Sequence, residues 1–303
     1  MVSEPKKTKL ANETEVAPVG KSGTRRRIPL SELPKPRERG DESVRRERLA
    51  TARQLLADAP QEAHELADLH RNLDRALNSL WMAYQPIVRA ATGSLFGYEA
   101  LLRSGDPSLP SPSAILGAAE KLGRIHDVGR AVRSKASDPT QRVRSPALLF
   151  INLHAIELND ETLISRSAPL TKIASRVVLE ITERGSLDAI NNVALRVRQL
   201  RELGFRIAID DLGAGYSGLT SFAHLEPDFA KLDMSLVRGV HQNPMKQKLV
   251  RSMTALCKDM GIAVVAEGIE VVEERDAVIE LGCDLLQGYL LARPGRAFPR
   301  VQR

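Results

Sequence analysis

Two adjacent acids, Asp210 and Asp211, end an apolar run and precede a glycine-rich segment. Neighbouring side chains on a strand point to opposite faces, so both acids reach one site only if the chain leaves the strand between them. Gly213 and Gly215 permit that departure because glycine adopts backbone angles that other residues avoid. Two acids placed in this way can share a pair of divalent cations about 3.5–4 Å apart. An isolated Asp-Asp pair is more often a helix N-cap beside a solvated loop acid.

Further polar residues end other short apolar runs. They are Glu99, Asn152, Glu180, Lys231, Glu267 and Gln287. Enzymes built on a parallel barrel place their chemistry at the carboxyl ends of the strands, so these side chains and the two aspartates are predicted to share one site. Taken singly, each has a structural explanation, such as a rim lysine paired with a neighbouring acid or a glutamate that caps a helix. Their joint occurrence at the ends of consecutive runs favours a common site.

The donor chemistry of this set indicates hard metal ions. Five carboxylates close together cannot all ionise without added positive charge, and two divalent ions with Lys231 would balance them. All donors are oxygens, with no paired histidine or cysteine, which indicates Mg²⁺ or Mn²⁺ rather than Zn²⁺. Two such ions suit the hydrolysis of a phosphate ester.

Eight short apolar runs predict the strands that carry these residues. The runs are Met82–Val88, Leu95–Leu102, Ala147–Leu153, Val177–Thr182, Phe205–Asp210, Phe229–Leu232, Ile262–Ala266 and Asp284–Leu286. Most are separated by helical patterns, namely Ser113–Lys121, Leu187–Leu203, Pro244–Met260 and Val271–Leu281. Strands that alternate with helices predict an α/β fold, here a (β/α)₈ barrel of the TIM type. Only a short turn, at Ala91-Thr92-Gly93, lies between the first two runs, so they are predicted to pair antiparallel.

The segment before the barrel has a different composition. Residues 1–40 hold ten Lys/Arg, five Asp/Glu, five prolines and no aromatic residue, which predicts a disordered basic tail. That tail carries +5 of the net charge of +6 and leaves +1 for the other 263 residues, so no DNA or RNA partner is expected. The tail is a candidate contact for an unknown partner, although such basic runs are usually solvated.

A helical pattern covers Asp41 to Leu80, with a break expected at Ala59-Pro60. Residues 41–62 are interpreted as a linker helix. Beyond them, an apolar seam predicts packing on the following domain, with dimerisation as the alternative; it consists of Leu66, Leu69, Leu73, Ala76 and Leu80. Two cysteines without metal-binding spacing favour a reduced, cytoplasmic setting. No apolar run reaches the length of about 18 residues that a membrane span needs, and the N-terminus lacks a signal-peptide core.

Seven motifs occur in order along the chain: YEALLR with Glu99, FINLHA, VVLEITE, IDDLGAGYSGL, FAKLD, VVAEGIE and LLQGYLLARP. This ordered set resembles the EAL family of cyclic di-GMP phosphodiesterases. The resemblance covers roughly three quarters of the chain and assigns residues 63–303 to an EAL phosphodiesterase domain. The tripeptide Glu99-Ala100-Leu101 alone would carry no information, whereas the whole set is specific. Leu212, Ala214 and Gly218 depart from the usual Phe, Thr and Ser of the family.

The resemblance implies a modified barrel with an antiparallel first strand that hydrolyses cyclic di-GMP to linear 5′-pGpG with two Mg²⁺ or Mn²⁺ ions. It also implies site residues. The metal ligands would be Glu99, Asn152, Glu180, Asp210, Asp211 and Glu267. Lys231 and Glu267 would orient or deprotonate the attacking water, and Gln85, Arg103 and Gln287 would face the nucleotide. Glu183 would steady the loop after Asp211, which is thought to link metal binding to dimerisation. Dimerisation is common in the family, so a homodimer is one candidate state, and the oligomeric state stays open.

Two alternatives of other classes stay open at this stage. One is a non-catalytic receptor for cyclic di-GMP, although such family members have usually lost metal acids and none is missing here. The other is a protein-interaction module that uses the basic tail. Formation of pGpG with Mg²⁺ separates the enzyme from both, and a binding assay without metal separates the receptor from the module.

Overall fold

The structure is a computed structural model that describes residues 42–142, 146–182, 192–213, 218–296 and 298–301. It divides into two compact units, Met1–Ala59 and Pro60–Arg303, and the fold described below belongs to the second. The predicted disordered tail lies outside the described residues. Helix α1 (Glu42–Ser79) crosses the division between the units, so the segment interpreted as a linker helix is part of this longer helix.

The break expected at Ala59-Pro60 is wrong, because α1 is continuous through Pro60. A proline inside a helix removes one hydrogen bond and more often bends a helix than ends it when both flanks favour helix. Alanine, leucine, glutamine and glutamate, all strong helix formers, dominate both flanks. Among the residues of the apolar seam, Leu73, Ala76 and Leu80 are buried and Leu66 is exposed.

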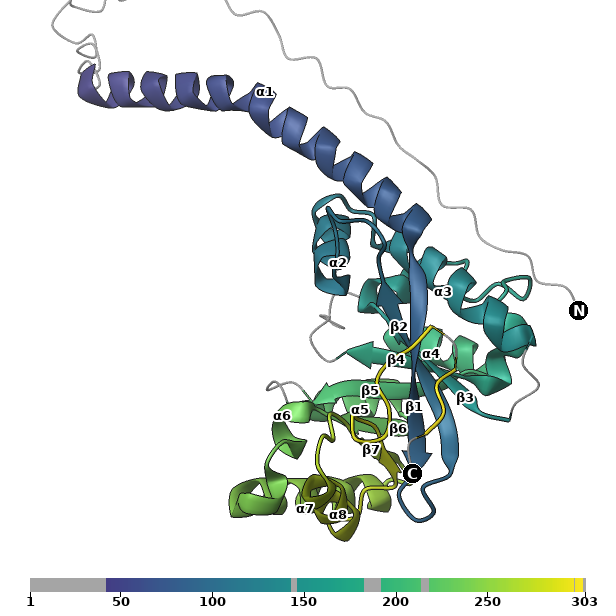
Figure 1. The fold of residues 1–303 in the computed structure, drawn as a ribbon. Helices are drawn as coiled ribbons and strands as arrows, with labels where there is room; N and C mark the ends of the chain where they lie inside the picture. The colour runs from purple at the N-terminus through teal and green to yellow at the C-terminus, as the bar shows by residue number, and fades with distance from the viewer. Residues whose placement is uncertain (1–41, 143–145, 183–191, 214–217, 297, 302–303) are drawn as a thin grey trace, which may run out of the picture. The chain divides into compact units, whose positions relative to one another are not determined.

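The eight strands form a closed barrel in sequence order (Figure 1). They are β1 (Trp81–Arg89), β2 (Leu95–Arg103), β3 (Leu148–Leu153), β4 (Val177–Thr182), β5 (Arg206–Leu212), β6 (Phe229–Leu232), β7 (Ala263–Ala266) and β8 (Leu285–Leu286). Strand β1 is antiparallel to both of its neighbours, β2 and β8, and the remaining pairs are parallel. The predicted barrel with a reversed first strand is therefore confirmed.

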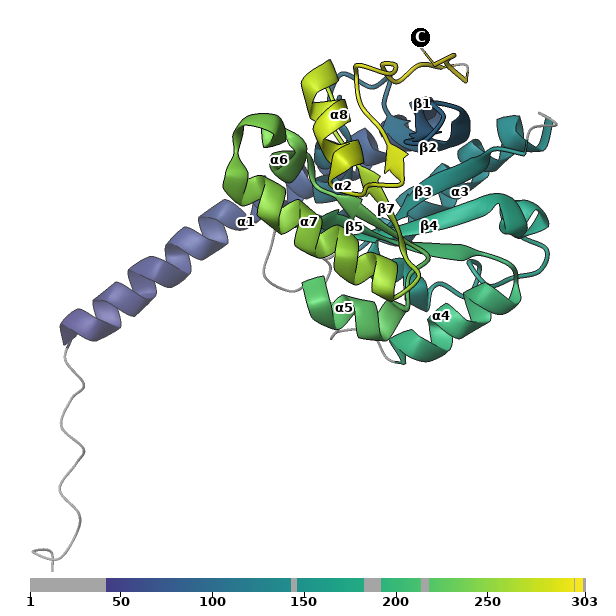
Figure 2. The same cartoon turned by 90° about the horizontal axis from the view of Figure 1, so that it is seen from below.

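Helices surround the barrel (Figure 2). They are α2 (Pro112–Lys121), α3 (Ile125–Arg142), α4 (Val193–Glu202), α5 (Gly218–Leu225), α6 (Met234–Val237), α7 (Pro244–Asp259) and α8 (Val272–Glu280), with short 3₁₀ segments at Ala155–Asn159, Thr171–Arg176 and Val240–Gln242. The sequence pattern does not indicate α3, because Gly129 and Pro139 interrupt it. The helix forms because its buried face, which includes Ile125, Val128 and Val132, packs on the barrel wall.

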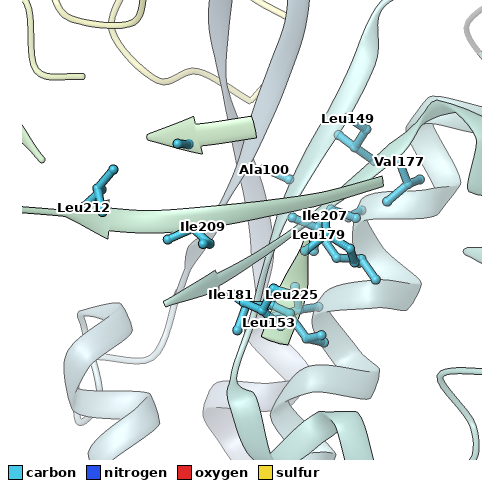
Figure 3. Packing of buried hydrophobic residues seen from close by; sticks show 14 of the residues in the cluster. Ala100, Leu149, Leu153, Val177, Leu179, Ile181, Ile207, Ile209, Leu212 and Leu225 are labelled. Carbon is cyan, nitrogen blue, oxygen red and sulfur yellow. The ribbon is translucent and has the colours of Figure 1, made fainter. Parts of the chain in front are cut away.

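The hydrophobic residues form two separate clusters. A small one fills the barrel interior and consists of Ile87, Phe150, Val178, Ala208, Phe229, Val265 and Leu285. The rings of Phe150 and Phe229 meet edge to face with centroids 5.3 Å apart. A larger cluster lies between the strands and the helices, and Figure 3 shows part of it around Leu179 and Ile207. Both clusters stabilise the barrel by removing apolar surface from water.

The C-terminal segment contacts β1 and β2 on their outer face, which α3 also helps to cover. Tyr84 and Gly295 exchange two backbone hydrogen bonds of 2.7 and 3.0 Å. The Tyr84 ring lies 4.4 Å from the ring of Phe298, and the Tyr98 hydroxyl donates to the carbonyl of Pro299 at 3.0 Å. Among the described residues, no helix is both long and apolar enough to cross a bilayer.

Candidate active site

The interior apolar cluster supports a layer of polar residues at one end of the barrel. On seven strands an apolar residue of the interior cluster stands two positions from a polar one, and alternate residues of a strand share a face. These pairs are Ile87/Gln85, Phe150/Asn152, Val178/Glu180, Ala208/Asp210, Phe229/Lys231, Val265/Glu267 and Leu285/Gln287. Because β1 runs in the opposite direction, its polar residue precedes its apolar one. The register of the barrel thus places the predicted site residues in one layer.

Strand β2 contributes Glu99 to the same layer and has Gly97 in place of an apolar residue. A Cβ on Gly97 would lie 2.8 Å from the backbone oxygen of Leu148 and 3.1 Å from a ring carbon of Phe150. Glycine therefore leaves the space that the phenylalanine ring occupies. Glu99 stands opposite Gln85 in the β1–β2 pairing, which brings the first predicted metal ligand beside a predicted substrate contact.

Lys231 lies at the centre of the polar layer and is only 1% exposed. Its ammonium nitrogen is close to carboxylate oxygens from four other strand ends. The distances are 2.6 Å to Glu180 Oε1, 2.7 Å to Glu267 Oε1, 3.2 Å to Asp210 Oδ1 and 3.6 Å to Glu99 Oε1. Four of the five predicted acids therefore converge on one cation.

Amide side chains hold Glu99 from two directions. Asn152 donates to Glu99 Oε1 at 2.9 Å, and Gln287 donates to Glu99 Oε2 at 2.6 Å. The same amide group of Gln287 also donates to Gln85 Oε1 at 3.2 Å, and Gln85 donates to the carbonyl of Ala292 at 3.1 Å. This chain of hydrogen bonds closes the site where β1 and β8 meet.

The chain leaves regular strand geometry between the two aspartates, as predicted. Asp211 has a φ of +57°, which is rare for a residue with a side chain, and Gly213 follows at +106°. The pairing of β5 with β6 shifts register between Ile209 and Leu212. Asp211 donates its backbone N–H to Asp210 Oδ1 at 3.0 Å, and both acids line the same cavity. Because its backbone is left-handed, Asp211 lines the same cavity as Asp210, whereas in a regular strand the two side chains would point to opposite faces.

The acids of the layer outnumber its positive charges, and their pKa values reflect this. Burial is the main reason that the pKa of Glu180 is raised well above its ordinary value and that the pKa of Glu267 is raised to about 8. Burial also opposes ionisation of Glu99, but Lys231 and the hydrogen bonds from Gln287 and Asn152 outweigh it and lower its pKa. The surrounding carboxylates raise the pKa of Lys231 well above its usual value despite its burial. One lysine therefore neutralises this group incompletely.

The donor set fits additional cations. Neither carboxylate oxygen of Glu180 accepts a well-aligned hydrogen bond from a described residue, although this side chain is fully buried. All available donors are oxygens, which bind Mg²⁺ and Mn²⁺. Within the described residues, however, no three His, Cys, Asp or Glu side chains are already placed to hold a metal ion, and four of the acids are arranged around the ammonium group of Lys231 instead. Asn152 directs its amide nitrogen at Glu99, so its oxygen would reach a cation only after the amide rotates.

A cavity of about 250 Å³ opens above this layer. Of the predicted residues it is lined by Gln85, Glu99, Asp210, Asp211, Lys231, Glu267 and Gln287. Glu180 lies beneath it, in contact with Lys231. Arg103 and Asn152 instead line a neighbouring, more apolar cavity of about 280 Å³. Glu183 lies outside the described residues.

Sequence reasoning assigned no role in the site to several other residues that line this cavity. They are Asp233, Met234, Arg238, Glu270 and Tyr289. All follow the ends of β6, β7 or β8 within six residues, so their place after a strand end was the available signal. Arg238 forms an ion pair with Glu270 across the mouth and supplies a cation other than Lys231. The cavity thus combines an acidic floor with a basic group on its rim.

Comparison with known proteins supports this description. The EAL domain family model matches residues 68–294. The cyclic di-GMP phosphodiesterase RocR of Pseudomonas aeruginosa is 35% identical over 246 residues, which are 77% of this chain and 61% of RocR. The PaMucR phosphodiesterase, solved with c-di-GMP, superimposes with a TM-score of 0.67 at 30% identity over 76% of this chain and 98% of that one. A manganese and cyclic di-GMP complex of Klebsiella pneumoniae BlrP1 gives a TM-score of 0.64 at 32% identity, over 72% of this chain and 56% of that one.

The chain spans less than two thirds of the curated relatives that match it. It corresponds to 61% of RocR, 30% of an uncharacterised signalling protein of Caulobacter vibrioides and 28% of the oxygen sensor protein DosP of Escherichia coli. The similarity therefore concerns one domain of these proteins.

Proposed function

The chain belongs to the EAL domain family, and we propose that it is a metal-dependent phosphodiesterase that hydrolyses cyclic di-GMP to linear 5′-pGpG. The observation that carries the proposal is the convergence of Glu99, Glu180, Asp210 and Glu267, which come from four different strands or the residue after one, on the buried ammonium group of Lys231. Such a group of acids is costly to bury, and a role in holding cations explains it. Relatives named as cyclic di-GMP phosphodiesterases favour this substrate.

The residues that would hold two Mg²⁺ or Mn²⁺ ions are Glu99, Asn152, Glu180, Asp210, Asp211 and Glu267. When bound, the ions supply a nucleophilic water at neutral pH and offset the negative charge that develops on the phosphate. Asp211 belongs to this set because its positive φ turns it into the same cavity as Asp210.

The remaining residues bind substrate and manage the proton. Gln85 and Gln287 present amide groups to the cavity, and Arg238 in its lining supplies positive charge for the phosphodiester. Arg103 lines the neighbouring cavity, and its contact with the nucleotide stays a prediction. Glu267 is placed to accept the proton of the attacking water. The ammonium nitrogen of Lys231, 2.7 Å from Glu267 Oε1, holds that carboxylate in position.

The direct test is the formation of pGpG by purified protein with cyclic di-GMP, with Mg²⁺, with Mn²⁺ and with EDTA. Glu99→Gln keeps the size of the side chain and removes a ligand charge, so we expect a loss of turnover of at least about 100-fold with little change in fold. Exposed Glu120 on α2 offers a matched control, and Glu120→Gln should keep full activity. Near-normal turnover by Glu99→Gln, or pGpG formation in EDTA, would contradict the metal assignment.

One observation favours a second candidate, a non-catalytic cyclic di-GMP receptor. Lys231 already contacts four acids, so the site holds together without added metal. A receptor would bind cyclic di-GMP in EDTA and leave it intact when Mn²⁺ is added.

A cytoplasmic location and a homodimer stay predictions, and light scattering on the purified chain tests the homodimer.

A further inference from the structure

A second cavity, of about 650 Å³, lies on the other side of β1 from the acidic layer. Gln85 faces the acidic cavity, whereas Met82 and Tyr84, which point to the opposite face of the strand, line this one. The two cavities share no lining residue. The outer face of β1 is covered by α3 and by the C-terminal segment, and residues from both line the larger cavity.

The charged groups of this outer cavity are all basic. Lys135 comes from α3, Lys172 from the 3₁₀ segment Thr171–Arg176, and Arg296 from the C-terminal segment. No acid is among the described residues that line the cavity. Within the described part of the chain, none of the three cations forms an ion pair with a carboxylate. Three cations from three separate elements that face one cavity without an acid call for an anionic ligand.

The guanidinium of Arg296 is held in a defined position. It lies over the ring of Trp81 with its central carbon 3.9 Å from the ring centroid. Cation–π stacking orients the guanidinium plane but leaves the N–H donors at its edge available. Such a planar fork is suited to phosphate oxygens, to which it donates two parallel hydrogen bonds.

The size and floor of the cavity indicate an organic phosphate rather than a small ion. A volume of about 650 Å³ far exceeds the volume of inorganic phosphate and lies within the range of about 300–1,000 Å³ typical of small-molecule sites. The half-buried ring of Trp81, flanked by the buried Leu80 and Met82, supplies an aromatic surface beside the cations. Aromatic side chains of this kind stack on nucleobases without regard to their identity.

We propose that this outer cavity, formed by Trp81, Lys135, Lys172 and Arg296, binds a nucleoside phosphate at a site separate from the acidic layer. Lys135, Lys172 and Arg296 receive the phosphate groups, and the base lies on the aromatic surface of Trp81. The site does not depend on the proposed hydrolysis of cyclic di-GMP. Both the linear product pGpG and the cellular triphosphates GTP and ATP have this chemistry.

Trp81 provides the test because it is the only tryptophan in the chain. Its fluorescence is followed in the full chain while pGpG, GTP, ATP, inorganic phosphate or polyglutamate is added. Excitation at the red edge of the tryptophan band avoids absorption by the nucleotides. EDTA is present throughout to keep divalent metal away from the acidic layer, and the double variant described below separates binding at the outer cavity from binding there.

We expect a saturable change in emission with at least one nucleotide and a much weaker response to inorganic phosphate. The double variant Lys135→Ala/Lys172→Ala should weaken nucleotide binding at least about tenfold, which corresponds to about 1.4 kcal/mol. Both lysines are exposed, so the fold should be kept, and Lys258→Ala on α7 serves as a matched control with unchanged binding. Tighter binding of pGpG than of the triphosphates would identify a product site, and the reverse would identify a site for cellular nucleotides.

Three results would overturn the proposal. The first is the absence of a saturable signal with every nucleotide. The second is equal affinity of the parent chain and the double variant. The third is binding of inorganic phosphate or of polyglutamate at least as tight as that of any nucleotide, which would indicate a simple anion site or a surface for acidic peptides.

Discussion

Replacement of Lys231 by methionine would remove one buried charge and keep most of the volume of the side chain. The ammonium group lies 2.6–3.6 Å from four carboxylates, and no other described lysine or arginine contacts them. Without it, the buried layer gains one net negative charge. The folded chain can restore its balance, in the absence of metal, by taking up one proton on a carboxylate.

The cost of that proton can be calculated. The ordinary pKa of a glutamate carboxyl is 4.5. To keep one carboxyl protonated in the folded chain at pH 7, which is 2.5 pH units above this pKa, costs about 3.4 kcal/mol, since each unit corresponds to about 1.36 kcal/mol. This agrees with the loss of about 3–5 kcal/mol typical when one partner of a buried ion pair is removed. At pH 5.5 the same proton costs only about 1.4 kcal/mol, so the penalty should shrink as the pH falls.

Urea unfolding in EDTA at pH 7 and at pH 5.5 measures this penalty for Lys231→Met against the parent chain. Lys258→Met on the exposed face of α7 is the control and should stay within about 0.5 kcal/mol of the parent at both pH values. Added Mn²⁺ should restore part of the lost stability, because the ion supplies the missing charge. A loss below about 1 kcal/mol at pH 7, or a loss that does not shrink at pH 5.5, would refute the reasoning that Lys231 neutralises these acids.

Two further predictions concern residues near the site. A Cβ on Gly288 would lie 2.0 Å from the backbone oxygen of Ile269, so Gly288→Ala should displace the loops that follow β7 and β8. We expect lower turnover and a loss of about 1–3 kcal/mol in the free energy of unfolding, measured with urea. The control is Gly117→Ala on α2, where a Cβ meets nothing within 4 Å, and this variant should not be destabilised. Burial raises the pKa of Glu157 from 4.5 to about 7. Between these two pH values the folded chain therefore binds more protons at this group than the unfolded chain does. For that reason Glu157 makes the free energy of unfolding fall as the pH rises from 4.5 to about 7. Glu157→Gln should flatten this slope in unfolding experiments at pH 5 and pH 7.5, and an unchanged slope would show that another group causes it.

The strands could be predicted from the sequence because a buried strand appears there as a short run of apolar residues. Most predicted strand limits lie within one residue of the observed ones, and the short connection of five residues after Arg89 correctly indicates the antiparallel hairpin. Helix α3 was not accessible, since Gly129 and Pro139 break its pattern and its packing on the barrel stabilises it. The continuous course of α1 through Pro60 likewise depends on its flanks rather than on the proline alone.

The sequence also allowed the residues of the candidate site to be proposed, but it did not predict how their side chains are arranged in space. Polar side chains at the ends of apolar runs indicated Glu99, Glu180 and Lys231, and the structure buries all three side chains. Arg238 and Tyr289 were missed because they stand in loops with no periodic signal. The place of Arg103 in a neighbouring cavity could not be read from its position near Glu99 in the sequence.

The sequence by itself determined the alternation of strands and helices, the oxygen-only donor set and the change of direction between Asp210 and Asp211. Those features depend on neighbours within a few residues, whose burial and backbone preferences are local. Only the tertiary structure decided that four acids turn toward Lys231, and that Trp81 and Arg296 meet across a basic cavity. These contacts join residues far apart in the chain, and the closure of the barrel between β1 and β8, not any local pattern, brings them together.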